Sequence, residues 1–461
     1  MQIGRKDVIW NFAATFMRVA SGIIVLPLVL RILPRQEYGL WTIYVTIGGL
    51  ATLLDFGFAN SFTRNVTYIF SGVKELKKEG YTPVNNDNSI DYGLLKSVIA
   101  AMRRYYGILS IIFLGVFTIV SPFYLTQILK EYSGNKSEIW VSWFAYGVLV
   151  AYQLYTYYYS SILSGRGKVK RVQQIIIIGQ VSRIGTAIIF LLLGYGIISL
   201  VIAQFVSDIV NRTLCYYSFY DKELKLNLHT SANIKVSEVM KLMTPNALKI
   251  GLTTMGGLLN SRLIILIAPL YLTLDQIASY GTTKQMIDLI ISLGLLWFGT
   301  YYPKITLHRV NEDFEQIKRM YLKAKFSMVM VFFICGAGLI FIGPSLLTLI
   351  HSKTQLLPAF MTFVFLIVAF LETNHGLAAQ MLLTKNEVPF AKASIISGLA
   401  SVALLFISLK LTTIGIWGMI LAPGIAQIVY QNWKWPYMVI KDLDIKFKDY
   451  FISAFTTIKQ L

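Results

Sequence analysis

Ionisable side chains interrupt the long apolar stretches of this 461-residue chain. They are Arg18, Asp55, Arg183, Asp208, Arg262, Lys284, Asp288 and Glu372, and Arg64 stands at the end of one such stretch. A charge at the centre of a membrane-spanning helix costs about 2.5–3.5 kcal/mol on insertion scales. We therefore expect these side chains to face a protein interior or a hydrated cavity, where their chemistry can serve a function.

The arginines are suited to binding phosphate. Arg18 and Arg262 have no opposite charge within their own apolar stretches. A guanidinium group binds phosphate oxygens with two parallel hydrogen bonds, and it keeps its charge when it is partly desolvated. We therefore predict that these two residues bind a diphosphate group.

The carboxylates allow two interpretations. Asp55, Asp208, Asp288 and Glu372 are candidates for coupling to a proton or sodium gradient, because a buried carboxylate can titrate. Arg183 and Asp208 lie at similar depth on consecutive antiparallel stretches, so they are equally a candidate structural ion pair. Lys284 and Asp288 are four residues apart, on one helix face, and could neutralise each other.

Signatures of catalysis and of metal binding are missing from the sequence. The four histidines are scattered without ligand spacing, and Cys215 and Cys335 lie in apolar stretches, so neither a zinc site nor a disulfide is predicted. Gly165–Lys168 is too short for a phosphate-binding loop. We predict no catalytic residue and no cofactor beyond the candidate coupling ion.

The composition predicts which kind of secondary structure carries these residues. Hydrophobic residues make up 55% of the chain and charged residues only 14%, whereas soluble domains carry roughly a quarter charged residues. The mean hydropathy is +0.60. Stretches of about 20 apolar residues, each long enough to cross a bilayer as a helix, recur along the whole chain. The sequence predicts an all-α polytopic membrane protein with about twelve spans.

The expected spans fall into two matching halves. They lie near 8–30, 38–60, 105–129, 139–163, 172–194 and 197–218, and then near 247–269, 277–300, 327–350, 360–383, 391–410 and 414–433. We predict an N-terminal lobe over 1–218, a cytoplasmic connector over 219–246, a C-terminal lobe over 247–433 and a cytoplasmic tail over 434–461. A polar segment at 79–92 has no predicted role.

The net charge of +19 resides mainly in alternate loops between the spans. A nucleic-acid-binding protein gathers its basic residues on a soluble face instead, so no nucleic-acid partner is predicted. Basic loops mark the cytoplasmic side of a membrane protein. Both termini are therefore predicted to be cytoplasmic.

Two motifs carry a resemblance to a known family. Leu33–Trp41 reads Leu-Pro-Arg-Gln-Glu-Tyr-Gly-Leu-Trp, and Asp55–Val66 reads Asp-Phe-Gly-Phe-Ala-Asn-Ser-Phe-Thr-Arg-Asn-Val. They resemble the first two spans of bacterial polysaccharide flippases of the O-antigen, capsule and teichuronic-acid type. The turn Ser164–Lys168 resembles the short basic loop of that family.

The resemblance implies membership of the multidrug/oligosaccharidyl-lipid/polysaccharide exporter superfamily, with two six-helix lobes around a central cavity and alternating access. It implies an undecaprenyl-diphosphate-linked glycan as substrate, flipped to the outer leaflet of the bacterial cytoplasmic membrane for surface polysaccharide biosynthesis. Membrane lipids and the polysaccharide polymerase machinery are further candidate partners. By span and depth, the family's cavity cations correspond to Arg18, Arg64, Arg262 and Lys284.

Two alternatives remain open. Cation-coupled multidrug efflux by the same fold predicts an acidic, aromatic cavity, which the basic span residues disfavour. A membrane glycan polymerase or glycosyltransferase would need a large outer loop or a soluble catalytic domain, and neither is visible in the sequence.

Overall fold

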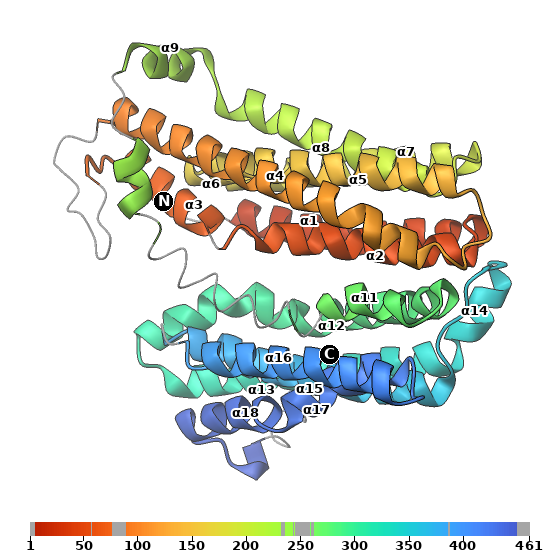
Figure 1. Cartoon of the computed structure of the whole chain (residues 1–461). Coiled ribbons are helices and arrows are strands. Elements are labelled where there is room, and N and C mark those ends of the chain that lie inside the picture. The colour runs from red at the N-terminus through yellow and green to blue at the C-terminus, as the bar shows by residue number, and fades with distance from the viewer. Residues whose placement is uncertain are drawn as a thin grey trace. The chain divides into compact units, whose positions relative to one another are not determined.

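The computed structural model describes residues 5–56, 58–75, 89–231, 236–242, 244, 259, 262–385 and 388–449. These residues form helices joined by short turns, and no strand occurs among them (Figure 1). Among the described residues, six helices are long and apolar enough to cross a membrane. They are α4 (Tyr92–Ile128), α7 (Val169–Leu192), α8 (Ile198–Phe219), α13 (Phe314–Phe341), α15 (Ala359–Leu383) and α16 (Ala391–Leu411). The prediction of an all-α, multi-pass membrane protein is confirmed.

The chain divides into two compact units. Unit 1 comprises Met1–Leu33 and Tyr44–Thr254, and unit 2 comprises Pro34–Ile43 and Met255–Leu461. Helix α2 (Arg35–Leu53) therefore contributes its first residues to unit 2 and the remainder to unit 1. The first turns of α2 pack closely in unit 2, because a Cβ on Gly39 would lie 2.3 Å from the Leu274 carbonyl oxygen.

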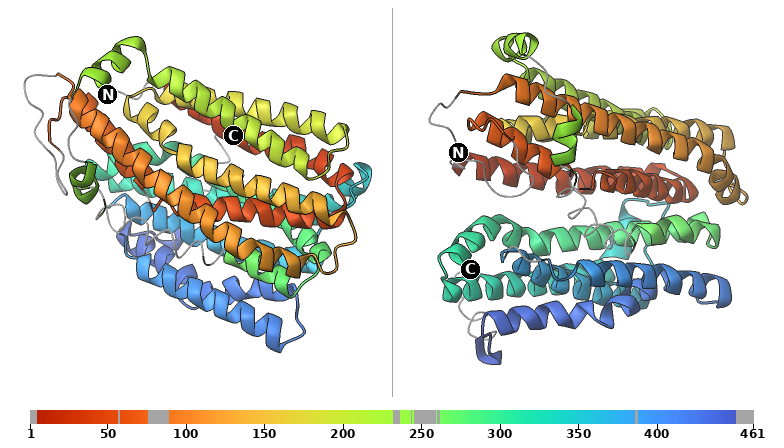
Figure 2. Two further views of the ribbon diagram at one scale, coloured as in Figure 1. Left: turned by 45° about the horizontal axis from the view of Figure 1, so that its top comes forward. Right: turned by 60° about the vertical axis from the view of Figure 1, so that its left-hand side comes forward.

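Unit 1 is a bundle of long helices and shorter connecting helices (Figure 2). Its helices are α1 (Arg5–Ile32), α3 (Phe58–Phe70), α4 (Tyr92–Ile128), α5 (Lys136–Thr156), α6 (Tyr158–Gly165), α7 (Val169–Leu192), α8 (Ile198–Phe219) and α9 (Lys222–Thr230). Helix α7 packs against both α1 and α8, while α4 packs on α5 and α5 on α8. These contacts bring polar residues of α1, α5, α7 and α8 into one interior.

Unit 2 is organised around α12 and α15. Its helices are α11 (Leu263–Ile267), the 3₁₀ turn η1 (Ala268–Leu270), α12 (Leu274–Val310), α13 (Phe314–Phe341), α14 (Gly343–Leu349), α15 (Ala359–Leu383), α16 (Ala391–Leu411), α17 (Trp417–Ile428) and α18 (Gln431–Asp442). Helix α12 packs on α13 and α15, α16 packs on α17, and α15 packs on α17 and α18.

Several expected spans are broken by local backbone chemistry. The span expected at 38–60 consists of α2 and α3, separated by a turn in which Phe56 has φ +48°. The span expected at 327–350 is divided between the end of α13, at Phe341, and α14, which begins at Gly343. Pro344 stands at this break and has no backbone N–H to continue the hydrogen-bond ladder. Proline and left-handed residues end helices at membrane depth only where other groups satisfy the freed backbone.

Two predicted segments fall largely outside the described residues. These are the seventh span, expected at 247–269, of which α11 and η1 form the end, and the polar segment at 79–92. The residues expected as a tail include most of α18, which packs on α15. Asp442, at the end of α18, pairs with Arg309 at 2.9 Å and with Lys385, so this helix is tied to the body of unit 2 by partly buried ion pairs.

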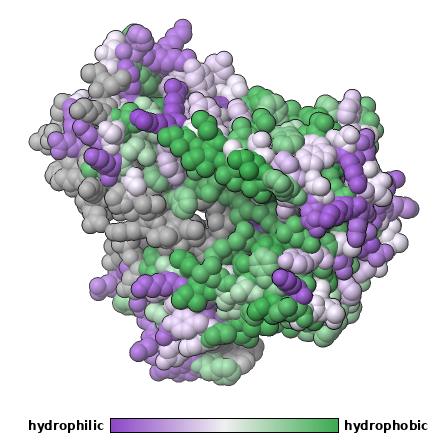
Figure 3. Space-filling view, in the orientation of Figure 1, coloured by the Kyte–Doolittle hydropathy of each residue, from purple (hydrophilic) through white to green (hydrophobic). Residues whose placement is uncertain are grey.

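The surface of each unit is consistent with a membrane environment. Hydrophobic side chains cover the middle of the visible face of both units, and hydrophilic side chains gather toward the ends of their helices (Figure 3). Exposed apolar residues are frequent on the outer faces of α4 and α16; examples are Ile111, Phe123 and Ile396. In water such a surface would be unfavourable, whereas lipid chains solvate it.

Candidate functional site

A polar network occupies the interior of unit 1. It joins Ser21 of α1, Gln153 of α5, Gln180 and Arg183 of α7, and Asp208 of α8. The helices can approach closely here because Gly179 lies against Asn211, where a Cβ would come within 2.4 Å of the amide. Small residues at a membrane helix interface allow such close contacts.

Among the described residues, Arg183 is anchored in this network through its Nη2. Its Nη2 donates a hydrogen bond to Ser21 Oγ, and Ser21 Oγ donates to Gln180 Oε1 at 3.0 Å. Its Nε is buried and has no hydrogen-bond partner among the described residues. The guanidinium therefore retains a donor that an anionic oxygen could satisfy, and such hydrogen bonds to charged groups are strong.

Asp208 lies near the middle of α8, and its side chain is buried. Gln153 Nε2 donates to its carboxylate at 2.5 Å, and Gln204 Nε2 donates at 3.3 Å. Arg183 and Arg212 interact with it electrostatically. Within the described part of the chain, the Asp208 carboxylate and the Arg183 guanidinium form no direct ion pair. They interact electrostatically from farther apart than the two members of an ion pair.

Arg212 adds a second positive charge to the network. It lies one turn after Asp208 on α8, and its Nε donates to Thr156 Oγ1 of α5 at 2.9 Å. Two guanidinium groups thus interact electrostatically with one carboxylate in the interior of unit 1. This excess of positive charge suits an anionic ligand better than a cationic one.

Unit 2 contains a second cluster with the opposite balance of charge. Lys284 Nζ pairs with Asp288 Oδ1 at 2.8 Å on α12, as their spacing predicts. Glu372 of α15 interacts electrostatically with both residues and also with the amide of Gln427 on α17. Two carboxylates therefore share one ammonium group, an arrangement that can take up a proton or a small cation.

The ion pair changes what Lys284 can do. Its charge is largely balanced by Asp288, whose side chain is 49% exposed and thus remains accessible. A diphosphate that binds Lys284 must compete with this carboxylate. The predicted cationic residues are therefore not equivalent, because Lys284 starts from an ion pair.

Each carboxylate oxygen of Asp55 accepts at least one hydrogen bond. The backbone N–H of Ala59 donates to Oδ1 at 3.0 Å and to Oδ2 at 3.2 Å, and the hydroxyl of Tyr106 donates to Oδ1. The carboxylate thus caps the start of α3 at the break that follows α2, where its negative charge interacts favourably with the helix dipole. This geometry gives Asp55 a structural role at the break.

Substitution of Asp55 by alanine should therefore lower the free energy of unfolding by about 2–4 kcal/mol. This estimate adds the loss of a helix cap to the penalty for leaving the buried Tyr106 hydroxyl unsatisfied. Thermal unfolding of the purified protein in detergent would measure the effect. Asp55→Asn, which keeps an oxygen for the cap, should be milder. Equal stabilities of the alanine variant and the wild type would contradict the capping role.

The remaining predicted cations are described less completely. Arg18 belongs to α1, three positions before Ser21, and its side chain lies outside the described set. Arg64 is exposed on α3. Arg262 is partly exposed in the turn that precedes α11. Arg18 and Arg64 thus belong to unit 1, and Arg262 and Lys284 belong to unit 2.

The basic turn Ser164–Lys168 binds the end of a neighbouring helix. Gly167 has φ +86°, which favours glycine, and Lys168 Nζ donates to the Ser218 carbonyl at 2.8 Å. Arg166 pairs with Asp221 at 2.5 Å. The Leu224 amide and then Arg166 lower the pKa of Asp221, the N-cap of α9. These contacts satisfy carbonyl groups at the end of α8, where positive charge is favourable.

Several members of the two clusters are absent from the residues predicted from the sequence. Arg212 lies within the span expected at 197–218 and shares a helix face with Asp208, four residues before it, but it is not among the predicted site residues. Gln153, Gln204 and Gln427 are uncharged and so did not stand out. The sequence signal that marks them is an amide side chain within an apolar stretch.

The fold is shared with solved structures of transporters. An inward-facing structure of a multidrug resistance MATE family transporter of the MOP superfamily aligns with a TM-score of 0.65 and 13% identity, over 95% of this chain and 99% of that chain. The lipid II flippase MurJ in an inward closed conformation aligns with a TM-score of 0.63 and 13% identity, over 98% and 90%. MATE in complex with MaD3S aligns with a TM-score of 0.52 and 16% identity, over 95% of both chains.

No protein-family model matches the sequence, and the comparison with curated proteins finds no match. The structural similarity nevertheless extends over nearly the whole chain and covers both units. It shows that the chain has the all-α fold of the MATE and MurJ structures. The similar structures are transporters and a flippase rather than enzymes.

Proposed function

We propose that this protein flips a polyprenyl-diphosphate-linked oligosaccharide from the cytoplasmic to the outer leaflet of a bacterial cytoplasmic membrane. The observation that carries the proposal is the network of unit 1, in which the guanidinium groups of Arg183 and Arg212 both interact electrostatically with one carboxylate, that of Asp208. An excess of guanidinium groups at membrane depth suits a diphosphate, which carries several acceptor oxygens and negative charge. The fold of the lipid II flippase is consistent with this class of substrate.

The physical difficulty for such a substrate lies in its glycan. Its hydroxyl groups cannot cross hydrocarbon unpaired, because each would lose its hydrogen bonds to water. A hydrated path lined by polar groups removes that cost, while the prenyl chain stays in lipid. In this mechanism each unit offers cations that suit a diphosphate. Unit 1 offers Arg18, Arg64 and Arg183, and unit 2 offers Arg262 and, once it exchanges Asp288 for phosphate, Lys284.

The cluster of unit 2 supplies a means of coupling. Glu372 lies beside the Lys284–Asp288 pair, so a proton or sodium ion taken up there changes the balance of charge around Lys284. Release of Lys284 toward the substrate would then depend on the bound cation. Coupling through this cluster requires that the substrate and the cation bind with different affinities in the two states of the transporter.

Cation-coupled drug efflux is the second candidate function. It is favoured by the excess of carboxylate in unit 2, which attracts organic cations, and by the same fold in the MATE transporters. The cationic network of unit 1 argues against it. The two functions therefore differ in which cluster meets the transported molecule.

The leaflet distribution of lipid-linked glycan in cells would test the proposal. Deletion of the gene should cause undecaprenyl-diphosphate-linked glycan to accumulate in the cytoplasmic leaflet. The wild type should restore its export, whereas Arg18→Ala and Arg262→Ala should not, at equal protein abundance in the membrane. A normal glycan distribution with raised sensitivity to cationic drugs would overturn the proposal in favour of efflux.

A further inference from the structure

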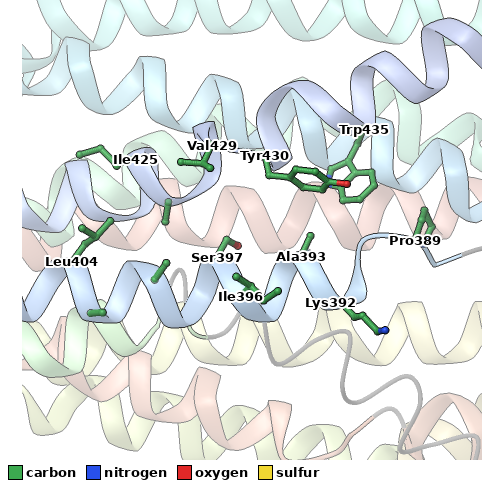
Figure 4. A pocket seen from close by; sticks show the side chains of 13 residues that line it. Pro389, Lys392, Ala393, Ile396, Ser397, Leu404, Ile425, Val429, Tyr430 and Trp435 are labelled. Carbon is green, nitrogen blue, oxygen red and sulfur yellow. The ribbon is translucent and has the colours of Figure 1, made fainter.

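A groove with a volume of about 660 Å³ runs along α16 in unit 2. Its lining comes from α16 on one side and from α17 and α18 on the other, with most of its residues apolar (Figure 4). The volume falls within the range of roughly 300–1,000 Å³ that is typical of ligand sites. This groove is separate from the clusters of unit 1 and unit 2 described above.

The packing of α16 on α17 closes one end of the groove. Near the far end of α16, Gly418 of α17 lies so close that a Cβ would meet Ser408 Oγ at 2.3 Å. The two helices are therefore in direct contact there. The groove begins beyond this contact, at Leu404 and Ile425, and its walls carry the small side chains of Ala393 and Ala400.

The opposite end of the groove combines a positive charge with aromatic rings. Lys392 lies at this end with Pro389, Tyr430 and Trp435, while Leu404 and Ile425 lie at the other end (Figure 4). The rings of Tyr430 and Trp435 meet edge to face at 5.6 Å. Tryptophan and tyrosine favour the boundary between lipid headgroups and hydrocarbon. The charge profile predicts that this end of α16 is cytoplasmic.

The floor of the groove is fixed at this aromatic end. Gln431 Nε2 donates a hydrogen bond to Ser397 Oγ, which ties α18 to α16, and both side chains are buried. The rim is open, because Ile396 and Val429 are 67% and 72% exposed. A chain-shaped apolar molecule could therefore enter from the side without displacing a buried group.

The length of the groove matches one leaflet of a bilayer. Lys392 and Leu404 are twelve residues apart on one helix, a span of roughly 18 Å at 1.5 Å per residue. One leaflet of a roughly 30 Å hydrocarbon layer is about 15 Å deep. A lipid chain anchored by its headgroup at Lys392 would thus end near Leu404 and Ile425.

We propose that this groove binds an anionic phospholipid of the cytoplasmic leaflet, with its phosphate at Lys392 and one acyl chain between α16 and α17. Basic pockets between helices on the cytoplasmic side are known to bind anionic headgroups, and the apolar lining takes the chain. The site adds a lipid ligand to the protein beyond its transported substrate. The prenyl chain of the substrate is the competing occupant.

Native mass spectrometry of the full-length protein tests this proposal. The probes are phosphatidylglycerol and phosphatidylcholine with identical acyl chains, with a photoreactive group near the chain end to map the contact. Phosphatidylglycerol should be retained preferentially and should label the segments around Leu404 and Ile425. Lys392→Gln should lower its affinity about fivefold, since one basic residue near the surface contributes about that much.

Matched variants on the same helix provide the controls. Lys410→Gln removes a charge at the other end of α16 and should leave binding unchanged. Ala400→Trp fills the groove and should abolish labelling of both segments, whereas Leu399→Trp, at a 58% exposed position outside the lining, should not.

Three results would overturn the proposal. Equal retention of the two lipids, with Lys392→Gln behaving like Lys410→Gln, would remove the headgroup site. Labelling that maps elsewhere would remove the groove. Displacement of phosphatidylglycerol by a polyprenyl phosphate that labels the same segments would assign the groove to the substrate chain instead.

Discussion

Substitution of Arg183 by glutamine is expected to slow the flipping of a diphosphate-linked glycan by about ten- to a hundredfold. Arg183 Nε is buried without a hydrogen-bond partner among the described residues, so the guanidinium can donate to a phosphate oxygen. A hydrogen bond to a charged group contributes about 1.5–3 kcal/mol, which corresponds to that loss in rate. The initial rate of flipping in proteoliposomes measures it.

The controls for this prediction separate charge from geometry. Arg183→Lys keeps the positive charge but loses the planar fork, so its rate should be intermediate. Lys170→Gln, near the start of the same helix, should flip at the rate of the wild type. A well-folded Arg183→Gln protein with an undiminished rate would contradict the role of this residue in binding the diphosphate.

The second large effect on transport is expected from substitution of Glu372. Replacing it by glutamine keeps the shape of the side chain but removes its ability to bind a proton or to hold a negative charge. Transport driven by an ion gradient should then be lost, while passive exchange across the membrane continues. For one coupled charge and a potential of 100 mV, the lost driving force is about 2.3 kcal/mol, or about fiftyfold in the final distribution.

The distribution of substrate in proteoliposomes with and without a proton or sodium gradient would measure this loss. Asp288→Asn is the matched control. Asp288 is the partly exposed member of the same cluster, and its substitution leaves Glu372 in place. It should weaken coupling less than Glu372→Gln does. Full gradient-driven accumulation by the Glu372→Gln protein would show that coupling does not use this carboxylate.

Much of the fold could be predicted from the sequence. Apolar stretches of membrane-spanning length correspond to the helices α4, α7, α8, α13, α15 and α16, because hydropathy and length follow directly from composition. The break between α2 and α3 could not be predicted in the same way. It depends on the left-handed Phe56 and on a hydrogen bond from Tyr106, which is distant in sequence.

Only part of the candidate site could be predicted from the sequence. The pairing of Lys284 with Asp288 follows from a spacing of four on one helix. The assembly of Arg183, Asp208 and Arg212 with Gln153 instead requires the packing of α5, α7 and α8, which no local pattern specifies. The contact of Glu372 with Gln427 likewise joins α15 to α17.

We propose that the protein moves a lipid-linked glycan by recognising its diphosphate. The most direct test is to reconstitute the purified chain in liposomes and to compare three polyprenyl-linked glycans, joined through a diphosphate, a monophosphate or a neutral ether. We predict that the protein flips the diphosphate form fastest and the neutral form no faster than protein-free liposomes do. Equal rates for the three forms, or transport of organic cations without any flipping, would contradict the account.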